Sequence, residues 1–323
     1  MKCEDDMEGY KIIKPLGSGG NCNAFLGKEI SSGKLVTIKK RKTEDSNFFN
    51  ESVILEELDH KSVPSLYKRS SEELILEYIP GKSLEKILIR KGLFTEKEAL
   101  HIAYELAGIM RYLHGRRKPV IYRDLKPSNI VMKPDGHICL IDFGAARFYE
   151  AGEASDTLNL GTLGFAAPEQ YGNLGQTDPR TDIYCFGMTI LQLVSGVDTK
   201  DTDEVAGFKK NGIKGISDEF IAVVDKCTRA DREDRFRSFR EIQEELEVIP
   251  KRKKTKKFIG MAKVVAWAAV LSVIISVGII NAEEVTSYAT NDFTERMPAV
   301  RMRFSYARSW IEDFLKENEV LIK

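Results

Sequence analysis

The sequence predicts an α+β protein that is followed by one transmembrane helix. Short β-branched runs bounded by turn residues mark the first part of the chain, as at 34–39 (KLVTIK). Apolar residues at helical spacing mark the middle and the region after about residue 180. The third observation is the run 258–280, whose 23 mostly apolar residues carry a single charge, Lys263. A globular domain and then a membrane segment are therefore expected.

The predicted strands have clear boundaries. The run 34–39 follows the turn signal Ser32-Gly33, and the run 74–78 (LILEY) ends at Pro80-Gly81. Further along, NIVM and HICLI flank Pro134-Asp135-Gly136, which is the pattern of a β-hairpin. Strands are therefore expected before the first long helix and again near the middle of the chain.

The first long helix is predicted to begin at Thr95. Thr95 and Glu98, three residues later, have the pattern of a capping box, in which each side chain bonds the backbone N–H of the other residue. Apolar residues then recur at helical spacing: Ala103, Leu106, Ala107, Met110 and Leu113. This pattern predicts one buried helical face.

Composition argues against several classes of protein. Of the 323 residues, 42% are hydrophobic, and 49 basic residues balance 49 acidic ones. Zero net charge gives no general attraction to nucleic acid, and no nucleic-acid partner is expected. The five cysteines are odd in number and lack metal-ligand spacing, so a reducing compartment without a disulfide framework fits. The polar N-terminus gives no sign of a cleavable signal peptide.

A glycine-rich segment at 16–24 (LGSGGNCNA) allows the backbone to turn tightly close to phosphates. Taken alone, it is equally consistent with an ordinary hairpin turn. Lys39, on the strand that follows, offers a positive charge to nucleotide phosphates. Glu51, twelve residues on, lies in a helical pattern from which it can hold that amine, although alone it would be read as a surface charge.

The segment 121–130 (IYRDLKPSNI) is the strongest signal, because three chemically active residues occur in it at fixed spacing: Asp124, Lys126 and Asn129. Asp142-Phe143-Gly144 follows at a strand end, where a carboxylate beside a glycine suits a hard cation such as Mg²⁺. Ala167-Pro168-Glu169 comes 25 residues later. Chance rarely produces such an order of motifs with fitting secondary structure around each.

On these motifs, residues 9–249 resemble a eukaryotic-type protein kinase domain of the bacterial Ser/Thr kinase kind. The resemblance implies a bilobal fold, with a small β-rich lobe and a larger helical lobe. It also implies ATP, Mg²⁺ or Mn²⁺, and protein substrates that offer a Ser or Thr hydroxyl. The residues of 126–129 (KPSN) favour these acceptors over Tyr.

The resemblance assigns roles to individual residues. Lys39 would pair with Glu51 and contact phosphates, Asp124 would orient the substrate hydroxyl, and Lys126 would neutralise the γ-phosphate. Asn129 and Asp142 would hold the metal. The remaining nucleotide contacts would come from Leu16, Gly17, Gly19, Gly20, Ala24, Glu77 and Ile79.

Three positions depart from the family pattern. Cys22 replaces the third glycine of the loop, and Ala24 replaces the usual valine, which would weaken ATP binding without abolishing it. Tyr122 replaces the usual histidine of the catalytic loop, where an aromatic residue can take over the packing role. Two other readings stay open: a pseudokinase that serves as a membrane-bound scaffold, and a small-molecule kinase of related fold.

Regulation is expected in the activation segment. Thr157, with Ser155 as second choice, is predicted to be autophosphorylated, and Arg123 to bind the phosphate. An unmodified loop hydroxyl is the alternative. Thr162 is expected to be structural, because in the family this threonine lies against the catalytic aspartate.

The membrane prediction completes the organisation. After an N-terminal extension (1–8) and the kinase domain (9–249) come a basic juxtamembrane segment (250–257), the transmembrane helix (258–280) and a tail (281–323). The basic run places the kinase in the cytoplasm and the tail outside. A buried core helix is the alternative reading of 258–280. The lipid bilayer is an expected partner, and the tail is open to a homodimer contact, an interfacial helix or a ligand site.

Overall fold

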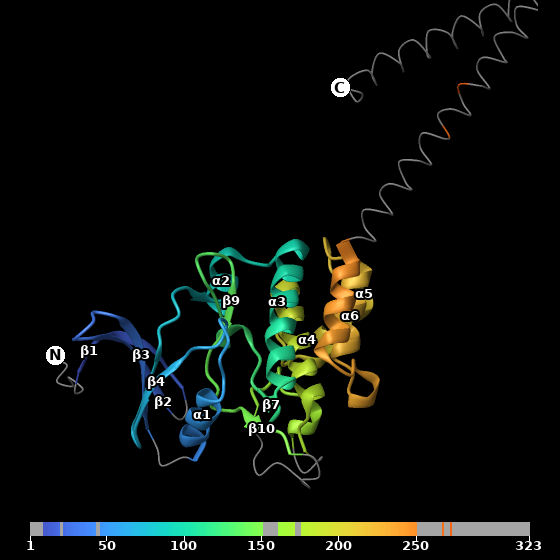
Figure 1. Cartoon of the computed structure of the whole chain (residues 1–323). Coiled ribbons are helices and arrows are strands. Elements are labelled where there is room, and N and C mark those ends of the chain that lie inside the picture. The colour runs from blue at the N-terminus through green and yellow to red at the C-terminus, as the bar shows by residue number, and fades with distance from the viewer. Residues whose placement is uncertain are drawn as a thin grey trace, which may run out of the picture. The chain divides into compact units, whose positions relative to one another are not determined.

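The computed structural model describes residues 9–19, 22–42, 46–150, 161–171 and 176–250, together with Trp267 and Ser272. The chain divides into two compact units, residues 1–252 and 253–323. The first unit holds every strand and helix named below. Figure 1 shows its strand-rich part, formed by the N-terminal residues, and its helical part beside it.

The strand-rich part is a five-stranded antiparallel sheet in the order β1-β2-β3-β5-β4. The predicted runs 34–39 and 74–78 coincide with most of two interior strands of this sheet, in which Val36, Ile38 and Lys39 and then Leu74, Ile75 and Leu76 are buried. The strands are β1 (Tyr10–Ser18), β2 (Cys22–Glu29), β3 (Leu35–Arg41), β4 (Leu66–Arg69) and β5 (Glu73–Glu77). One helix, α1 (Ser46–Glu56), packs in this part and contacts β4.

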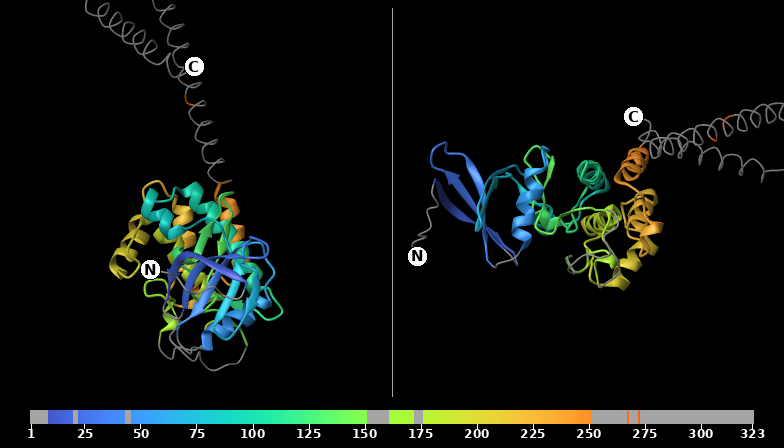
Figure 2. Two further views of the ribbon diagram at one scale, coloured as in Figure 1. Left: turned by 90° about the vertical axis from the view of Figure 1, so that its left-hand side faces the viewer. Right: turned by 60° about the horizontal axis from the view of Figure 1, so that its bottom comes forward.

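The helical part is built around α3 (Glu96–His114) and α4 (Pro179–Ser195), which contact each other. The Thr95–Glu98 capping box at the start of α3 is present as predicted. The other helices are α2 (Leu84–Lys91), α5 (Thr202–Asn211) and α6 (Asp218–Cys227), and residues 239–250 are also helical. Figure 2 separates this group of helices from the sheet in its right-hand view.

The motif residues lie on short strands and turns between the two parts. The predicted hairpin is confirmed, since β8 (Ile130–Met132) pairs antiparallel with β9 (Ile138–Leu140) across the turn at Gly136. The remaining elements are β6 (Lys82–Ser83), β7 (Val120–Ile121), β10 (Arg147–Phe148) and three short 3-10 helices, η1 (Pro127–Asn129), η2 (Pro168–Gln170) and η3 (Arg232–Asp234). One apolar core runs beneath them from α1 to the helix at 239–250, so the motif loops rest on a packed base.

The predicted transmembrane segment falls outside the described residues, apart from Trp267 and Ser272, which are both helical. Among the helices that the structure describes, none is long and apolar enough to cross a membrane. The tail 281–323 and the extension 1–8 also lie outside the described part of the chain.

Candidate active site

The glycine-rich segment connects β1 to β2. Gly17 pairs with Ala24 and Ser18 with Asn23, so the turn is confined to the few residues between them. The backbone N–H of Gly19 donates to the carbonyl of Cys22 at 2.9 Å, which closes the turn. Leu16 and Ala24 are half-buried, and Gly20 lies outside the described residues.

Three charged residues from distant parts of the sequence meet beside this loop. Lys39 Nζ lies 2.5 Å from Glu51 Oε1 and 2.8 Å from Asp142 Oδ1. Strand β3 supplies the lysine and helix α1 supplies the glutamate, while Asp142 follows strand β9. The side chains of Lys39 and Glu51 are buried, whereas that of Asp142 is about half exposed, at 46%. The pairing expected for Lys39 and Glu51 is thus present.

The charges in this group support one another. Burial works against the Lys39 charge, but Asp142 and Glu51 outweigh it, and the lysine pKa lies above its usual value. The nearby Lys39 ammonium lowers the pKa of Asp142 despite partial desolvation. Burial raises the pKa of Glu51, against the attraction of Lys39 and a hydrogen bond from the Phe143 N–H. Asp142 is therefore held ionised, as a metal ligand must be.

Helix α1 also fixes the backbone that follows Asp142. The Phe143 N–H donates to Glu51 Oε1 at 3.0 Å, and Asn50 Nδ2 donates to the Ala146 carbonyl at 2.7 Å. Asp142 itself has a φ of 67°, a left-handed conformation that costs energy in a residue with a side chain. Contacts from α1 help to maintain this strained turn.

A second group of polar residues surrounds Asp124. Its carboxylate accepts a hydrogen bond from Thr162 Oγ1 at 2.7 Å and another from Asn129 Nδ2 at 2.8 Å, and Lys126 Nζ lies 2.8 Å away. Lys126 Nζ also donates to Thr162 Oγ1 at 2.6 Å. Thr162 therefore lies against Asp124, as expected, and links it to the lysine.

The loop that carries Asp124 is braced from α4. Asp182, fully buried, accepts hydrogen bonds from the N–H groups of Tyr122 at 2.8 Å and Arg123 at 2.7 Å. Its Oδ2 also lies 2.8 Å from His114 Nε2 at the end of α3. The Tyr122 hydroxyl donates to the carbonyl of Ile141, directly before Asp142. Sequence reasoning missed both His114 and the tyrosine hydroxyl, because neither belongs to a local motif.

Arg123 occupies an interior position rather than an open one. Its side chain is buried and donates through Nε to the Ala145 carbonyl at 2.6 Å. Thr157 and Ser155, the predicted phosphorylation sites, lie outside the described residues. The contact that Arg123 makes with Ala145 could not be read from the sequence, since it depends on how the two loops fold together.

The remaining predicted residues lie in two other places. Glu77 ends strand β5 and Ile79 follows it, both half-buried, in the connection between the two parts of the domain. Farther away, Glu169 of the Ala167-Pro168-Glu169 motif forms a two-pronged ion pair with Arg235, at 2.7 and 2.9 Å. This buried pair fixes the segment after Thr162 to the helical part.

The donors beside the loop fit a divalent cation of the hard class. Asp142 offers a carboxylate and Asn129 an amide oxygen, the ligand types that Mg²⁺ and Mn²⁺ prefer. No group of three or more His, Cys, Asp or Glu side chains in the described residues has the arrangement of a complete metal site. Oxygens of a phosphate ligand and water would have to complete the coordination.

Comparison of the sequence with known proteins is consistent with this site. A protein kinase domain family matches residues 10–246. Serine/threonine-protein kinase D of Synechocystis sp. is 36% identical over 57% of this chain and 40% of its own length. Serine/threonine-protein kinase PrkC of Bacillus subtilis is 28% identical over 58% of this chain and 30% of its own length. Wall-associated receptor kinase-like 4 of Arabidopsis thaliana is 28% identical over 69% of this chain and 31% of its own length.

These curated relatives are longer proteins, and the chain spans about three tenths to two fifths of their length. The matched region nevertheless covers the whole of the sheet, the site and most of the helical part. With the family match over residues 10–246, the chain belongs to the protein kinase family.

Proposed function

We propose that this chain is an active Ser/Thr protein kinase that transfers the γ-phosphate of ATP to protein hydroxyls. The observation that carries the proposal is the contact of Lys39 with both Glu51 and Asp142, with Asp124 held on the neighbouring loop. A scaffold without catalytic activity would gain nothing from holding Lys39, Glu51 and Asp142 together, because burial of charged side chains costs free energy. The complete set also counts against the pseudokinase alternative.

Each residue of the set has a distinct task in the proposal. Asp124 accepts or orients the proton of the substrate hydroxyl, and Thr162 and Asn129 hold its carboxylate in place. Lys126, 2.8 Å from Asp124, offsets negative charge on the γ-phosphate as it moves. The proposal is therefore one of positioning and charge stabilisation.

The nucleotide is proposed to lie under the glycine-rich loop and against the connection between the two parts. Lys39 contacts its phosphates while Glu51 holds the amine. Asn129 and Asp142 hold Mg²⁺ or Mn²⁺, which neutralises phosphate charge when bound. The other proposed nucleotide contacts are Leu16, Gly17, Gly19, Gly20, Ala24, Glu77 and Ile79.

The alternative of a small-molecule kinase is disfavoured by the segment after Thr162. Its Glu169–Arg235 ion pair supports a platform of the kind on which protein kinases dock their substrates. The relatives described above are themselves named protein kinases. The hydrogen bond that Lys126 donates to Thr162 favours Ser and Thr as acceptors of the phosphate.

The decisive experiment is phosphoryl transfer by purified protein with ATP and Mg²⁺, followed by mapping of phosphorylated residues. Asp124→Asn should lose most of the transfer, by roughly 10²–10⁴-fold, while its dissociation constant for ATP changes little. Lys39→Ala should weaken both. If the Asp124→Asn protein turns over at the wild-type rate, the assignment of roles is wrong.

Regulation is proposed to act through Thr157, with Ser155 as second choice. A phosphate there would add a charge of about −1.5 to −2, which arginine side chains bind well. Arg123 is the proposed partner, and its contact with Ala145 would let it report phosphate binding to the backbone after Asp142. Mass spectrometry of the wild-type and Asp124→Asn proteins tests this. Full activity of Thr157→Ala, with no phosphate between residues 150 and 162, would refute it.

The proposed location is the cytoplasmic face of a membrane, with residues 258–280 as a single transmembrane helix and 281–323 outside. The support is the sequence itself: a basic run at 251–257 followed by 23 residues with one charge. Proposed partners are Ser- and Thr-containing proteins, the lipid bilayer and a second copy of the chain.

A further inference from the structure

Lys42 bridges the end of strand β3 and the glycine-rich loop. Its Nζ donates to Ser18 Oγ at 2.7 Å and to the Gly19 carbonyl at 2.5 Å. Ser18 is the last residue of β1, and Gly19 belongs to the loop itself. One ammonium group therefore holds two consecutive loop positions from outside the loop.

Strand register explains how the lysine reaches that far. Cys22, the first residue of β2, pairs with Arg41, the last residue of β3. The residue after Arg41 therefore lies just beyond the start of β2. Because β2 lies between β1 and β3 in the sheet, a long side chain at position 42 can pass the end of β2 and meet the loop.

The backbone from which Lys42 projects is anchored. The Arg41 N–H donates to the Glu72 carbonyl at 2.8 Å, and the Arg41 guanidinium donates to the Glu72 carboxylate at 2.7 Å. These contacts fix the end of β3 to the turn between β4 and β5. Only the side chain of Lys42 must then be ordered to hold the loop, which reduces the entropy cost of the contact.

The loop is already restrained on its other side. Gly19 N–H donates to the Cys22 carbonyl, and Cys22 lacks the conformational freedom of the glycine that the family pattern has here. Burial raises the pKa of the Cys22 thiol, while Lys39 and Lys42 both act to lower it. The positive charges of Lys39 and Lys42 therefore both act on Cys22, at the start of β2.

We propose that Lys42 is a positioning residue for the nucleotide, holding Ser18 and Gly19 of the glycine-rich loop in place before the nucleotide arrives. This rests on the proposed function. A loop that is ordered in advance has less entropy to lose when phosphates bind beneath it, so affinity rises without a new contact to the ligand. Lys42 acts through the loop, so its removal should weaken every ligand whose phosphates lie there.

The test is direct binding to the purified full-length chain in detergent, with ATP, ADP and adenosine, each with Mg²⁺. Lys42→Met should raise the dissociation constants of ATP and ADP by about 3- to 10-fold, the effect of losing two exposed hydrogen bonds. Adenosine, which lacks phosphates, should bind within about 2-fold of wild type. Lys42→Arg should restore most of the affinity, since arginine also donates to both acceptors.

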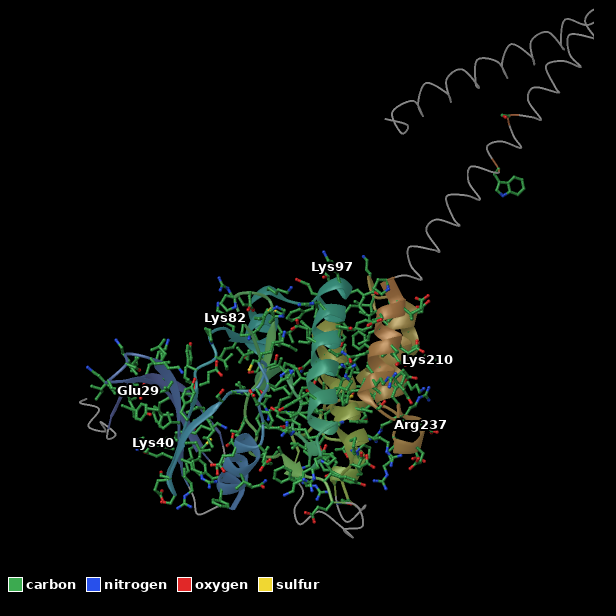
Figure 3. All side chains as sticks on the ribbon, viewed as in Figure 1. Glu29, Lys40, Lys82, Lys97, Lys210 and Arg237 are labelled. Carbon is green, nitrogen blue, oxygen red and sulfur yellow. The ribbon has the colours of Figure 1, made fainter. Side chains whose placement is uncertain are left out.

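Two further variants separate the bridge from a general effect of charge. Lys40→Met removes a neighbouring lysine, labelled in Figure 3, that pairs with Glu73 at 3.4 Å, and it should leave all three affinities unchanged. In a Ser18→Ala background, Lys42→Met should cost less than in wild type, because one of its acceptors is already gone.

Unchanged ATP and ADP affinities in Lys42→Met would overturn the inference. So would a loss confined to ATP, which would indicate a direct contact with the γ-phosphate rather than a loop effect. Failure of the wild-type chain to bind ATP at all would instead refute the proposed function, so the two ideas fail in different ways.

Discussion

Asn50 Nδ2 donates to the carbonyl oxygen of Ala146 at 2.7 Å, and this bond joins helix α1 to the backbone four residues after Asp142. Its neighbour Glu51 accepts from the Phe143 N–H in the same stretch. Two adjacent residues of one helix thus hold both ends of a short segment. The position of α1 and the position of the proposed metal ligand are therefore coupled.

We predict that Asn50→Ala lowers kcat/KM by about 5- to 10-fold, the effect of one lost hydrogen bond on the placement of Asp142. Asn50→Asp should lower it further, because a carboxylate would face the Ala146 carbonyl. Steady-state kinetics at saturating Mg²⁺ measure both. Glu57→Gln, at an exposed position just beyond α1, is the control and should match wild type. Equal activity of all three variants would contradict the coupling.

The Tyr122 hydroxyl is a second contact that ties the catalytic loop to the segment before Asp142. Tyr122 is fully buried, its ring meets Phe143 edge-on at 5.1 Å, and its hydroxyl donates to the Ile141 carbonyl. Removing the hydroxyl would leave the Ile141 carbonyl, which is partly buried, without this donor. Such a loss costs more than a surface hydrogen bond.

Tyr122→Phe should therefore lower the free energy of unfolding by about 1–3 kcal/mol. Tyr122→Ala should cost about 3–5 kcal/mol, because it also leaves a cavity beside Phe143. Chemical denaturation of the kinase domain measures both. Tyr104→Phe is the matched control: its hydroxyl bonds Glu247 at 2.8 Å on the surface, so its loss should stay within about 0.5 kcal/mol. A Tyr122→Phe protein as stable as this control would show that the buried bond is unimportant.

Local sequence signals predicted the parts of the fold that local forces determine. The capping box at Thr95, the hairpin around Gly136 and the strands β3 and β5 were all found, because each depends on residues that are close in sequence. Motif spacing also identified the residues that form the charged site. What it could not supply was contact between loops: the bonds from Asn50, Lys42 and the Tyr122 hydroxyl join segments that only folding brings together.

Arg123 is another case in which the sequence identified a residue but not its surroundings. Its type and position led to the prediction of a phosphate-binding group, which stays a prediction, and the motif gave no indication that its side chain is buried and donates to the Ala145 carbonyl. Burial of an arginine depends on the acceptors that surround it, and the Ala145 carbonyl belongs to a residue 22 positions away. A motif names the residue but not its environment.

The Thr95 capping box gives a pH-dependent prediction. Glu98 bonds Lys91 at 2.5 Å and accepts from the backbone and hydroxyl of Thr95, both at 2.9 Å, and these contacts lower its pKa from 4.5 to about 2. A carboxylate whose pKa is depressed by folding contributes stability above its unfolded pKa. That contribution is lost as the pH falls from about 4.5 through about 2.

Glu98→Gln should therefore reduce the free energy of unfolding at pH 7 by about 0.5–1 kcal/mol, a modest value because the carboxylate is partly exposed. The difference from wild type should shrink between pH 4.5 and pH 3. Denaturant titrations of both proteins at pH 7, 5, 4 and 3 measure it, and Glu57→Gln should show no such trend. A difference that stays constant with pH would mean that the charge of Glu98 is not what stabilises α3.

The final prediction concerns the membrane segment. If residues 258–280 span a bilayer, the full chain should sediment with membranes and resist carbonate extraction. Deletion of 258–323 should release a soluble, active kinase domain, because the described contacts of the site all lie within residues 9–250.

Val270→Arg combined with Ile274→Arg should abolish integration, since each charge at a helix centre opposes insertion by about 2.5–3.5 kcal/mol. Thr286→Arg, outside the apolar run, is the control and should leave integration intact. Protease added to intact cells should remove only residues beyond about 280. Full-length protein recovered in the soluble fraction without detergent would contradict this, and a loss of kinase-domain stability on deletion would favour a core helix instead.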